Sequence, residues 1–280
     1  VGALPVRLVA TGWPPPGWVV VACAVGQGDA LVLPVAAGRA VVVDAGPDPT
    51  PVDRCLHRLN VRTVSLLVVS HFHADHVGGL AGVFRRRTVE AVVVPPWPEP
   101  AEARDAVHHT AAAHRVPVTE VAPGWRHTAG SVALTALGPP HPMRGTRSDP
   151  NNNSLVIRAE VAGVDILLAG DAEAEEQRAL LDRAPPETFR ADVLKLPHHG
   201  SAYQEWSFLK AVDPAVALVP VGAQNGYGHP NPGVLDRLVH SGVRVLRTDR
   251  DGDVAVVGGG RHRLAVAVRG LPPGEDRGGR

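Results

Sequence analysis

The chain has 280 residues, and 44% of them are hydrophobic, which is enough to bury a sizeable core. Its 28 basic and 28 acidic residues cancel, so the composition excludes a domain that attracts nucleic acid through an overall positive field. Any contact with DNA must therefore come from a local group of basic residues.

Hydropathy and cysteine usage bear on the environment of the chain. No apolar run approaches the roughly 18 residues that a membrane span needs, and the N-terminus lacks the layout of a signal peptide. Cys23 and Cys55 form no disulfide framework, and we expect Cys23 to be a buried thiol because it lies in an apolar strand. We expect a soluble domain, and the cysteines leave its compartment open.

The apolar pattern predicts one domain over residues 18–270. Residues 1–17 contain Trp13-Pro-Pro-Pro-Gly, which is typical of a stiff linker from an upstream region, and we expect residues 271–280 to be disordered. Strands are predicted at 18–25, 30–35, 40–43, 64–69, 91–94, 117–121, 131–137, 154–161, 164–169, 191–196, 215–221, 243–247, 254–257 and 263–268. Helices are predicted at 50–60, 77–84, 101–114, 172–183, 206–212 and 232–241.

The chemistry of the chain centres on residues 70–79, Ser-His-Phe-His-Ala-Asp-His-Val-Gly-Gly, which follow a β-branched strand. Three imidazoles and one carboxylate lie within six residues, and such ligands suit zinc, manganese or iron. One ion would not need four of them, so the pattern predicts two. A histidine-rich surface loop is the alternative, but it would not explain the strand before the cluster or the Gly-Gly after it.

This His-x-His-x-Asp-His pattern at a strand end resembles the signature of the metallo-β-lactamase superfamily. A strand before the cluster, ending at Asp44-Ala-Gly, and a strand after it, ending at Gly-Asp171, resemble that family's earlier Asp-x-Gly motif and its later bridging Asp. Four more segments make residues 18–258 similar to the C-terminal domain of the ComEC family of DNA-uptake proteins: Val-Gly-Gln-Gly-Asp-Ala (25–30), Asn-Asn-Asn-Ser-Leu-Val (151–156), Leu-Lys-Leu-Pro-His-His-Gly-Ser (194–201) and Tyr-Gly-His-Pro (227–230). The resemblance implies an α/β (α+β) fold, the four-layer αββα sandwich.

The resemblance also implies a ligand set for two divalent ions, manganese or zinc. The ligands carried over are His71 and His73 for the first ion, Asp75 and His76 for the second, and Asp171 between them. Either His229 or the His198-His199 pair completes the second site. We favour His229, because it follows a strand and precedes a helix.

A third histidine is expected for the first ion, but its slot reads Asn151-Asn152-Asn153-Ser154. His127 and His141 are weaker alternatives, since the first lies one hairpin too early and the second lies in a Pro-rich loop. We therefore expect two imidazoles, Asp171 and water or an asparagine carbonyl oxygen around this ion. An oxygen-richer site favours manganese over zinc.

Further residues of the similar segments are expected to support catalysis. We predict that His199 is the general acid, with His198 packed or orienting another ligand, although His199 as a metal ligand and His229 as a structural residue is the alternative. Asp44 should orient a ligating imidazole, unless it is only a buried structural carboxylate. The supporting or substrate-facing residues are Asp44, Asn151, Asn153, Lys195 and Ser201, and Asp75 joins the histidines as catalytic.

Two features depart from the pattern or add to it. Relatives usually have Asp where this chain has Ala24, so the contribution of that carboxylate is missing. Arg85, Arg86 and Arg87 end a predicted helix, where they either bind phosphate or form solvated C-terminal caps. We expect His108, His109 and His114 to be surface residues.

The expected activity is metal-dependent phosphodiester hydrolysis. The resemblance implies a DNase that degrades the strand not imported during DNA uptake, with single-stranded DNA, an upstream membrane-channel domain and other competence proteins as partners. It places the domain on a bacterial plasma membrane protein, and the extracellular face is favoured. The alternatives are another phosphodiesterase on the same fold and a non-catalytic module that guides DNA.

Overall fold

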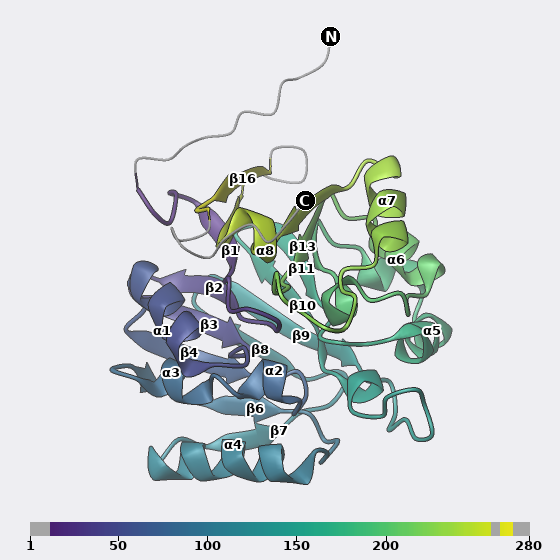
Figure 1. Cartoon of the computed structure of the whole chain (residues 1–280). Helices are drawn as coiled ribbons and strands as arrows, with labels where there is room; N and C mark the ends of the chain where they lie inside the picture. Colours follow the sequence, from purple (N-terminus) through teal and green to yellow (C-terminus); the bar gives the residue numbers. More distant parts are fainter. Residues whose placement is uncertain (1–11, 259–263, 271–280) are drawn as a thin grey trace.

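The computed structural model describes residues 12–258 and 264–270. Its first sheet takes strands from the N-terminal half and from the C-terminal end of the chain (Figure 1). The order is β16 (Ala265–Val268), β15 (Val254–Val257), β1 (Trp18–Ala22), β2 (Leu31–Ala36), β3 (Arg39–Val43), β4 (Thr63–Val68), β6 (Val92–Val94) and β7 (Val118–Glu120), and β5 (Thr88–Val89) pairs with β4. These segments are rich in valine, which packs well on a pleated surface.

The second sheet is built from the later half of the chain. Its order is β14 (Arg244–Arg247), β13 (Val216–Val219), β12 (Val193–Lys195), β11 (Val164–Leu168), β10 (Val156–Val161), β9 (Val132–Gly138) and β8 (Arg126–Ala129). The inner faces of both sheets share one apolar core, which includes Leu33, Val41, Leu134 and Ile157.

Helices cover the outer face of each sheet, which completes the αββα sandwich (Figure 1). The first sheet packs against α1 (Pro49–Arg58), α3 (Leu80–Phe84) and α4 (Ala101–Ala113), and the second against α5 (Ala174–Arg183), α6 (Trp206–Val212) and α7 (Pro232–His240). The predicted fold is confirmed. Among the described residues, every helix is too short or too polar to cross a membrane.

Parallel strand pairs in both sheets determine where the functional residues gather. β3 runs parallel to β4, and β11, β12 and β13 are parallel neighbours in the second sheet. The carboxyl ends of these strands lead directly into Asp44, Ser70, Asp171, His198 and Pro220. Residues far apart in the sequence therefore meet at one end of the sandwich.

Some elements differ from the predictions. The helix expected at 77–84 is two helices, α2 (Ala74–Val77) and α3, which are separated by Gly78 and Gly79. At Gly79 the backbone passes so close to Ala45 that a Cβ would lie 2.0 Å from the Ala45 carbonyl oxygen. The short elements β5, β8 and α8 (Thr248–Asp251) were not predicted, nor were the 3-10 turns η1 (Asn151–Asn153), η2 (Pro186–Phe189) and η3 (Pro197–Gly200).

The ends of the chain pack more closely than predicted. Trp13, within the stretch expected to be a linker, packs against the core cluster on the helical side of the first sheet. β15 and β16, which follow β14 in the sequence, return to the first sheet and pair beside β1. The predicted tail at 271–280 lies outside the described residues, as does residue 263 at the start of the last predicted strand.

The expectation of a buried thiol at Cys23 is wrong, because Cys23 and Cys55 form a disulfide with Cα atoms 5.9 Å apart. Both residues are buried where the end of β1 meets α1. Their sequence separation of 32 carries no spacing signal, so only the packing of α1 on the sheet brings them together.

We expect the disulfide to stabilise the domain. The double variant Cys23→Ala/Cys55→Ala should lose about 2–4 kcal/mol of unfolding free energy, because its unfolded chain is less constrained. Urea denaturation of both proteins with and without reductant measures this. Reductant should destabilise the wild type and leave the double variant unchanged. Two reactive thiols in the denatured, unreduced wild type would contradict the disulfide.

A second stability prediction concerns Glu176, which α5 buries completely. Burial raises the pKa of its carboxyl well above the ordinary value, and the Ser154 amide offsets only part of the shift. The folded protein then holds a proton that the unfolded chain releases above its pKa near 4.5, so wild-type stability falls as the pH rises.

The variant Glu176→Gln keeps the shape without the ionisation. At pH 8 it should exceed the wild type by about 1–3 kcal/mol in unfolding free energy, and the difference should vanish near pH 4. Thermal denaturation across this pH range measures it, with Asp182→Asn on the exposed face of α5 as the matched control. A pH-independent difference would show that ionisation is not the cause.

Candidate metal centre

Asp171, directly after β11, lies at the centre of the site and is buried. Its Oδ2 lies 3.3 Å from His76 Nε2, 3.5 Å from His199 Nε2, 3.8 Å from His198 Nε2 and 4.0 Å from His71 Nε2. Its Oδ1 accepts a hydrogen bond from Lys195 Nζ at 3.2 Å. One carboxylate oxygen thus faces four imidazoles, while the other is held by an ammonium group.

His71 and His73 form one group of donors beside Asp171. The distance between His71 Nε2 and His73 Nδ1 is 3.1 Å, so the two ring nitrogens point at one another. Burial, together with neighbouring His76, holds the pKa of His71 well below its usual value, and burial also lowers the pKa of His73. Both rings are therefore neutral at physiological pH, which is the form that binds metal.

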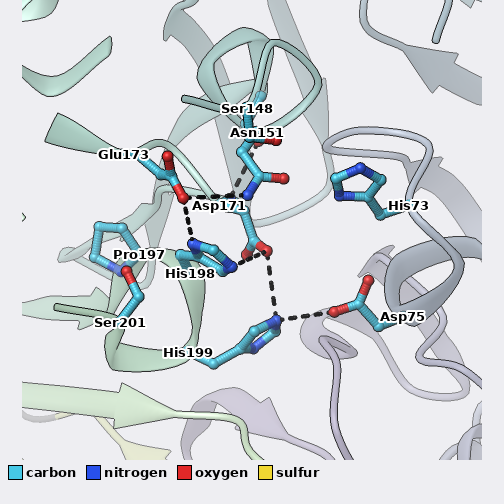
Figure 2. Close-up of polar contacts among 12 residues, drawn as sticks. His73, Asp75, Ser148, Asn151, Asp171, Glu173, Pro197, His198, His199 and Ser201 are labelled. Atoms are coloured by element: carbon cyan, nitrogen blue, oxygen red, sulfur yellow. Dashed lines mark hydrogen bonds and ion pairs between the residues drawn. The ribbon is translucent and has the colours of Figure 1, made fainter. Parts of the chain in front are cut away.

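A second group of donors comes from Asp75, His76, Asp171 and His199, whose ligand atoms all lie within 4.8 Å of one another. His199 Nε2 lies 3.3 Å from Asp75 Oδ2 (Figure 2). Two carboxylates and two imidazoles at this spacing match the ligand types that surround zinc or manganese in proteins.

Hydrogen bonds on the opposite ring nitrogen orient both imidazoles of this second group. His76 Nδ1 lies 2.9 Å from Asp44 Oδ2, and Asp44 in turn accepts from the Ser70 amide and hydroxyl at 2.7 Å. His199 Nδ1 lies 2.9 Å from the Pro220 carbonyl oxygen, which only accepts, so Nδ1 carries the proton. In each ring Nε2 therefore faces the carboxylates. Metal-binding histidines are commonly oriented in this way, by a hydrogen bond on the ring nitrogen that does not bind the ion.

Asp29 is a buried member of the site that was not singled out in the sequence. Its Oδ2 lies 2.5 Å from Lys195 Nζ, and its Oδ1 lies 3.3 Å from His199 Nδ1. Burial alone would raise the pKa of Asp29, but Lys195 and His199 outweigh it and lower the pKa. The Gly-Gln-Gly-Asp turn was the available sequence signal for Asp29. Gly28 in this turn lets the loop approach Asp75, because a Cβ at residue 28 would lie 2.0 Å from the Asp75 carbonyl oxygen.

Lys195 is fully buried between the carboxylates of Asp29 and Asp171, so it cannot contact substrate as one of its predicted roles required. Burial would lower the pKa of Lys195, but these two carboxylates raise it above the ordinary value. The ammonium group therefore stays charged and fixes Asp171.

Glu173 is the second site residue that sequence reasoning missed. Its Oε1 lies 2.9 Å from His198 Nδ1, so His198 Nε2 turns towards Asp171 (Figure 2). Asn151 Nδ2 approaches the same Oε1 at 3.5 Å. Glu173 is buried, and it follows Asp171 by two residues at the end of β11, which was the only available signal.

The three asparagines of η1 have different roles. Asn153 bonds the Met143 amide and carbonyl and thereby braces the loop before η1, rather than facing the site. Asn152 accepts from the Glu176 amide. Asn151 lies beside Glu173, and its buried Oδ1 has no hydrogen-bond partner among the described residues. Of the three, only Asn151 offers an oxygen to the site.

The geometry favours the alternative assignment for this pair, with His199 as a metal ligand and His229 outside the ligand group. His229 lies beyond His198, with ring centroids 4.8 Å apart, and outside the group of four ligand atoms. Burial and the neighbouring His198 and His199 rings lower its pKa to about 4. His199 has its Nε2 among the ligand atoms and its Nδ1 on a carbonyl, which leaves no nitrogen for proton transfer to substrate.

Other sequence candidates lie away from the cluster or are already paired. His127 stacks on Trp125 in β8, and His141 is an exposed loop residue. Ser201 is buried, and its Oγ accepts from the Tyr203 amide, 3.3 Å away. The Ala24 amide donates to Asp253, so another buried carboxylate braces the strand where relatives have Asp.

The members of the arginine triplet differ in their surroundings. Arg87 donates to the Asp53 carboxylate at 2.7 Å and to the carbonyls of Gly82 and Val61, and its side chain is 5% exposed. Arg85 shares the same Asp53 partner but is 48% exposed, and Arg86 is exposed. Arg87 therefore ties the end of α3 to α1, and phosphate binding by Arg85 and Arg86 stays a prediction.

The donor set fits divalent cations. His76 Nε2 is buried and lacks a hydrogen-bond partner among the described residues, although two carboxylates face it. The pKa of His76 is raised well above its usual value: burial opposes this, but Asp171, Asp75 and Asp44 outweigh it. A site that attracts protons this strongly will also attract metal ions.

The backbone beneath the cluster is strained. His198 and His199 have φ of 46° and 51°, and Asp44 has φ of 60°, in the left-handed region that non-glycine residues rarely adopt. The His198 amide donates to the Gly170 carbonyl, which helps to hold this turn. Strained residues of this kind cluster at functional sites.

Comparisons of sequence identify the family of the chain. The metallo-β-lactamase superfamily matches residues 24–222. ComE operon protein 3 of Bacillus subtilis (strain 168) is 29% identical over 195 residues, which are 69% of this chain and 24% of that protein. Competence protein ComA of Neisseria gonorrhoeae is 29% identical over 231 residues, 81% of this chain and 30% of that protein. The chain thus spans less than a third of these relatives.

Comparisons of structure support the fold. CmlA, a diiron beta-hydroxylase from Streptomyces venezuelae, has a TM-score of 0.53 at 14% identity, covering 83% of this chain and 53% of that one. Zn(2+)-bound PqqB from Methylobacterium extorquens has a TM-score of 0.51 at 10% identity, covering 82% and 98%. Because the family model matches most of its sequence and its αββα fold agrees, the chain belongs to the metallo-β-lactamase superfamily, whose members are typically metal-dependent hydrolases.

Proposed function

We propose that the site would hold two divalent ions, with Asp171 available to both. His71, His73 and Asn151 would hold the first, and Asp75, His76 and His199 would hold the second. The support is the pair of donor groups on either side of one carboxylate oxygen, together with the unpaired Asn151 oxygen. The oxygen ligand favours manganese over zinc at the first position. Iron in CmlA and zinc in PqqB accompany the same fold.

We infer further that the domain hydrolyses phosphodiester bonds in DNA, as a nuclease of the ComEC type acting on the strand that is not imported. The observation that carries this proposal is His198, an imidazole beside Asp171 that lies outside the group of four ligand atoms and is held by Glu173. A phosphodiester expels a poor alkoxide leaving group, so its cleavage needs a proton donor. Similarity to two competence proteins supports DNA as the substrate.

The chain's own residues divide the work. The two ions would supply Lewis-acid activation of water and of the phosphate. His198 Nε2 delivers the proton to the leaving oxygen, and the Glu173 carboxylate, whose Oε1 lies 2.9 Å from Nδ1, keeps that ring in the required orientation. Asp44 and Pro220 hold His76 and His199 so that their Nε2 atoms stay towards the centre.

The disulfide supports a location outside the cytoplasm. Disulfides persist in oxidising environments, whereas cytosolic proteins of mesophiles keep their thiols reduced. The Cys23–Cys55 bond therefore agrees with the extracellular face of the membrane. At that face we propose an upstream membrane channel and other competence proteins as partners.

The two-ion proposal is tested by elemental analysis of the purified domain after reconstitution with manganese or zinc. The wild type should hold two ions per chain, and Asp171→Asn should bind both at least about tenfold more weakly, because each ion loses the shared carboxylate. Asp182→Asn is the control for loss of an exposed acid. One ion in the wild type, or full occupancy in the Asp171 variant, would overturn the arrangement.

The catalytic proposal is tested on labelled DNA and on bis-p-nitrophenyl phosphate. His198→Ala should keep both ions and lose about two to four powers of ten in rate on DNA. It should lose much less on the nitrophenyl ester, whose leaving group needs no proton. His240→Ala, an exposed histidine at the end of α7, is the matched control. A wild type that hydrolyses neither substrate with either metal would favour a non-catalytic module that guides DNA. Equal losses of rate on both substrates in His198→Ala would show that His198 is not the general acid.

A further inference from the structure

The chain contains only two tyrosines, and each has an exposed ring that reaches His198 through intervening side chains. Tyr227 is 74% exposed and Tyr203 is 44% exposed, the former in the loop after β13 and the latter in the loop after η3. Large apolar rings rarely stay exposed without a function when they gather at one site. The other large exposed apolar residues in the described part, Val239 and Val268, are aliphatic.

Tyr227 connects to the site through stacked rings. Its ring lies 13° from parallel to that of His229, with centroids 6.0 Å apart, and His229 lies against His198 at 4.8 Å. The exposed ring is therefore two ring contacts away from the imidazole proposed to protonate the leaving group. The stack therefore presents the flat face of an exposed ring beside the site.

Tyr203 connects to His198 by a different route. The guanidinium carbon of Arg147 lies 3.3 Å from the Tyr203 ring centroid, and Arg147 Nε lies 3.5 Å from Glu173 Oε2. Glu173 is the residue that holds His198 Nδ1. The Arg147 side chain is 46% exposed, so it retains donors for an anion while its plane is fixed on the tyrosine.

Two exposed aromatic rings and one partly exposed guanidinium group fit a single strand of nucleic acid. Unpaired bases stack on exposed aromatic rings, and arginine contacts the phosphates between them. In a duplex the bases are stacked on one another, so their faces are not available to the tyrosines. The cation is local, which agrees with a chain whose net charge is zero.

We propose that Tyr227 and Tyr203, with Arg147, form a rim that binds unstacked bases of single-stranded DNA on the two sides of the phosphate at His198. This proposal rests on the proposed function and specifies its substrate. The rim contacts base faces and phosphates, so it discriminates single strands from duplexes but not one sequence from another.

The test uses fluorescence anisotropy with a dye-labelled twelve-residue thymidine oligonucleotide carrying uncleavable phosphorothioate linkages. The comparison ligands are the same backbone with abasic sites and a duplex of equal length. The wild type should bind the thymidine strand about 5- to 100-fold more tightly than the abasic strand, the range for stacking of one base on one ring.

Substitutions separate stacking from the other contributions. Tyr227→Ala and Tyr203→Ala should each lower the thymidine-over-abasic preference by the contribution of one ring, and Tyr227→Phe should keep it because the ring remains. Val239→Ala, on α7, should leave the preference unchanged. Arg147→Gln should weaken both single strands alike and reduce the salt dependence of binding.

Equal affinity of the wild type for thymidine and abasic strands, or tighter binding of the duplex, would overturn the rim. So would an unchanged preference in the variant that lacks both tyrosines. These outcomes are independent of hydrolysis, because the linkages are uncleavable. Failure to cleave DNA or bis-p-nitrophenyl phosphate would instead count against the catalytic function and leave the binding result standing.

Discussion

The metal centre depends on one buried ammonium group, that of Lys195 between Asp29 and Asp171. Taking carboxylates out of water is costly unless opposite charge and hydrogen bonds compensate. Lys195 Nζ, which also donates to the Gly170 carbonyl, supplies that compensation at the end of β12. Because it engages Asp171 Oδ1, the other oxygen faces the four imidazoles, and the division of the ligands into two groups follows from this orientation.

The fold makes such a concentration of charge possible because parallel strands of two sheets end at the same place. β3 and β4 contribute Asp44 and the histidine cluster, while β11 and β12 contribute Asp171 and His198. The sheets are stabilised by the helices and by the shared apolar core, and the polar groups at this edge are not part of that core. Strain at His198 and His199 is then supported by surrounding structure, since the His198 amide bonds to Gly170 and the His199 ring to Pro220.

The sequence was sufficient to predict site residues that lie close together along the chain. It was insufficient where membership of the site depends on the direction of a side chain. His71, His73, Asp75 and His76 lie within one turn after a strand, so spacing alone brings them together. His199 and His229 both follow strands, and only the contact of His199 with Pro220 decides which one enters the cluster. Two more kinds of feature depend on packing between distant segments: the carboxylates of Asp29 and Glu173, and the Cys23–Cys55 bond.

If the chain hydrolyses a phosphodiester as proposed, its cations must lie where the phosphate reacts, because a chain of zero net charge has no long-range field to attract a polyanion. Arg87 does not fit this role, since the Asp53 carboxylate and four carbonyl oxygens accept from its guanidinium group. Arg147 fits it, because its plane rests on Tyr203 and its Nε lies 3.5 Å from Glu173 Oε2. Glu173 Oε1 lies 2.9 Å from His198 Nδ1, so in the proposed function this one carboxylate would couple anchoring of the phosphate to delivery of the proton.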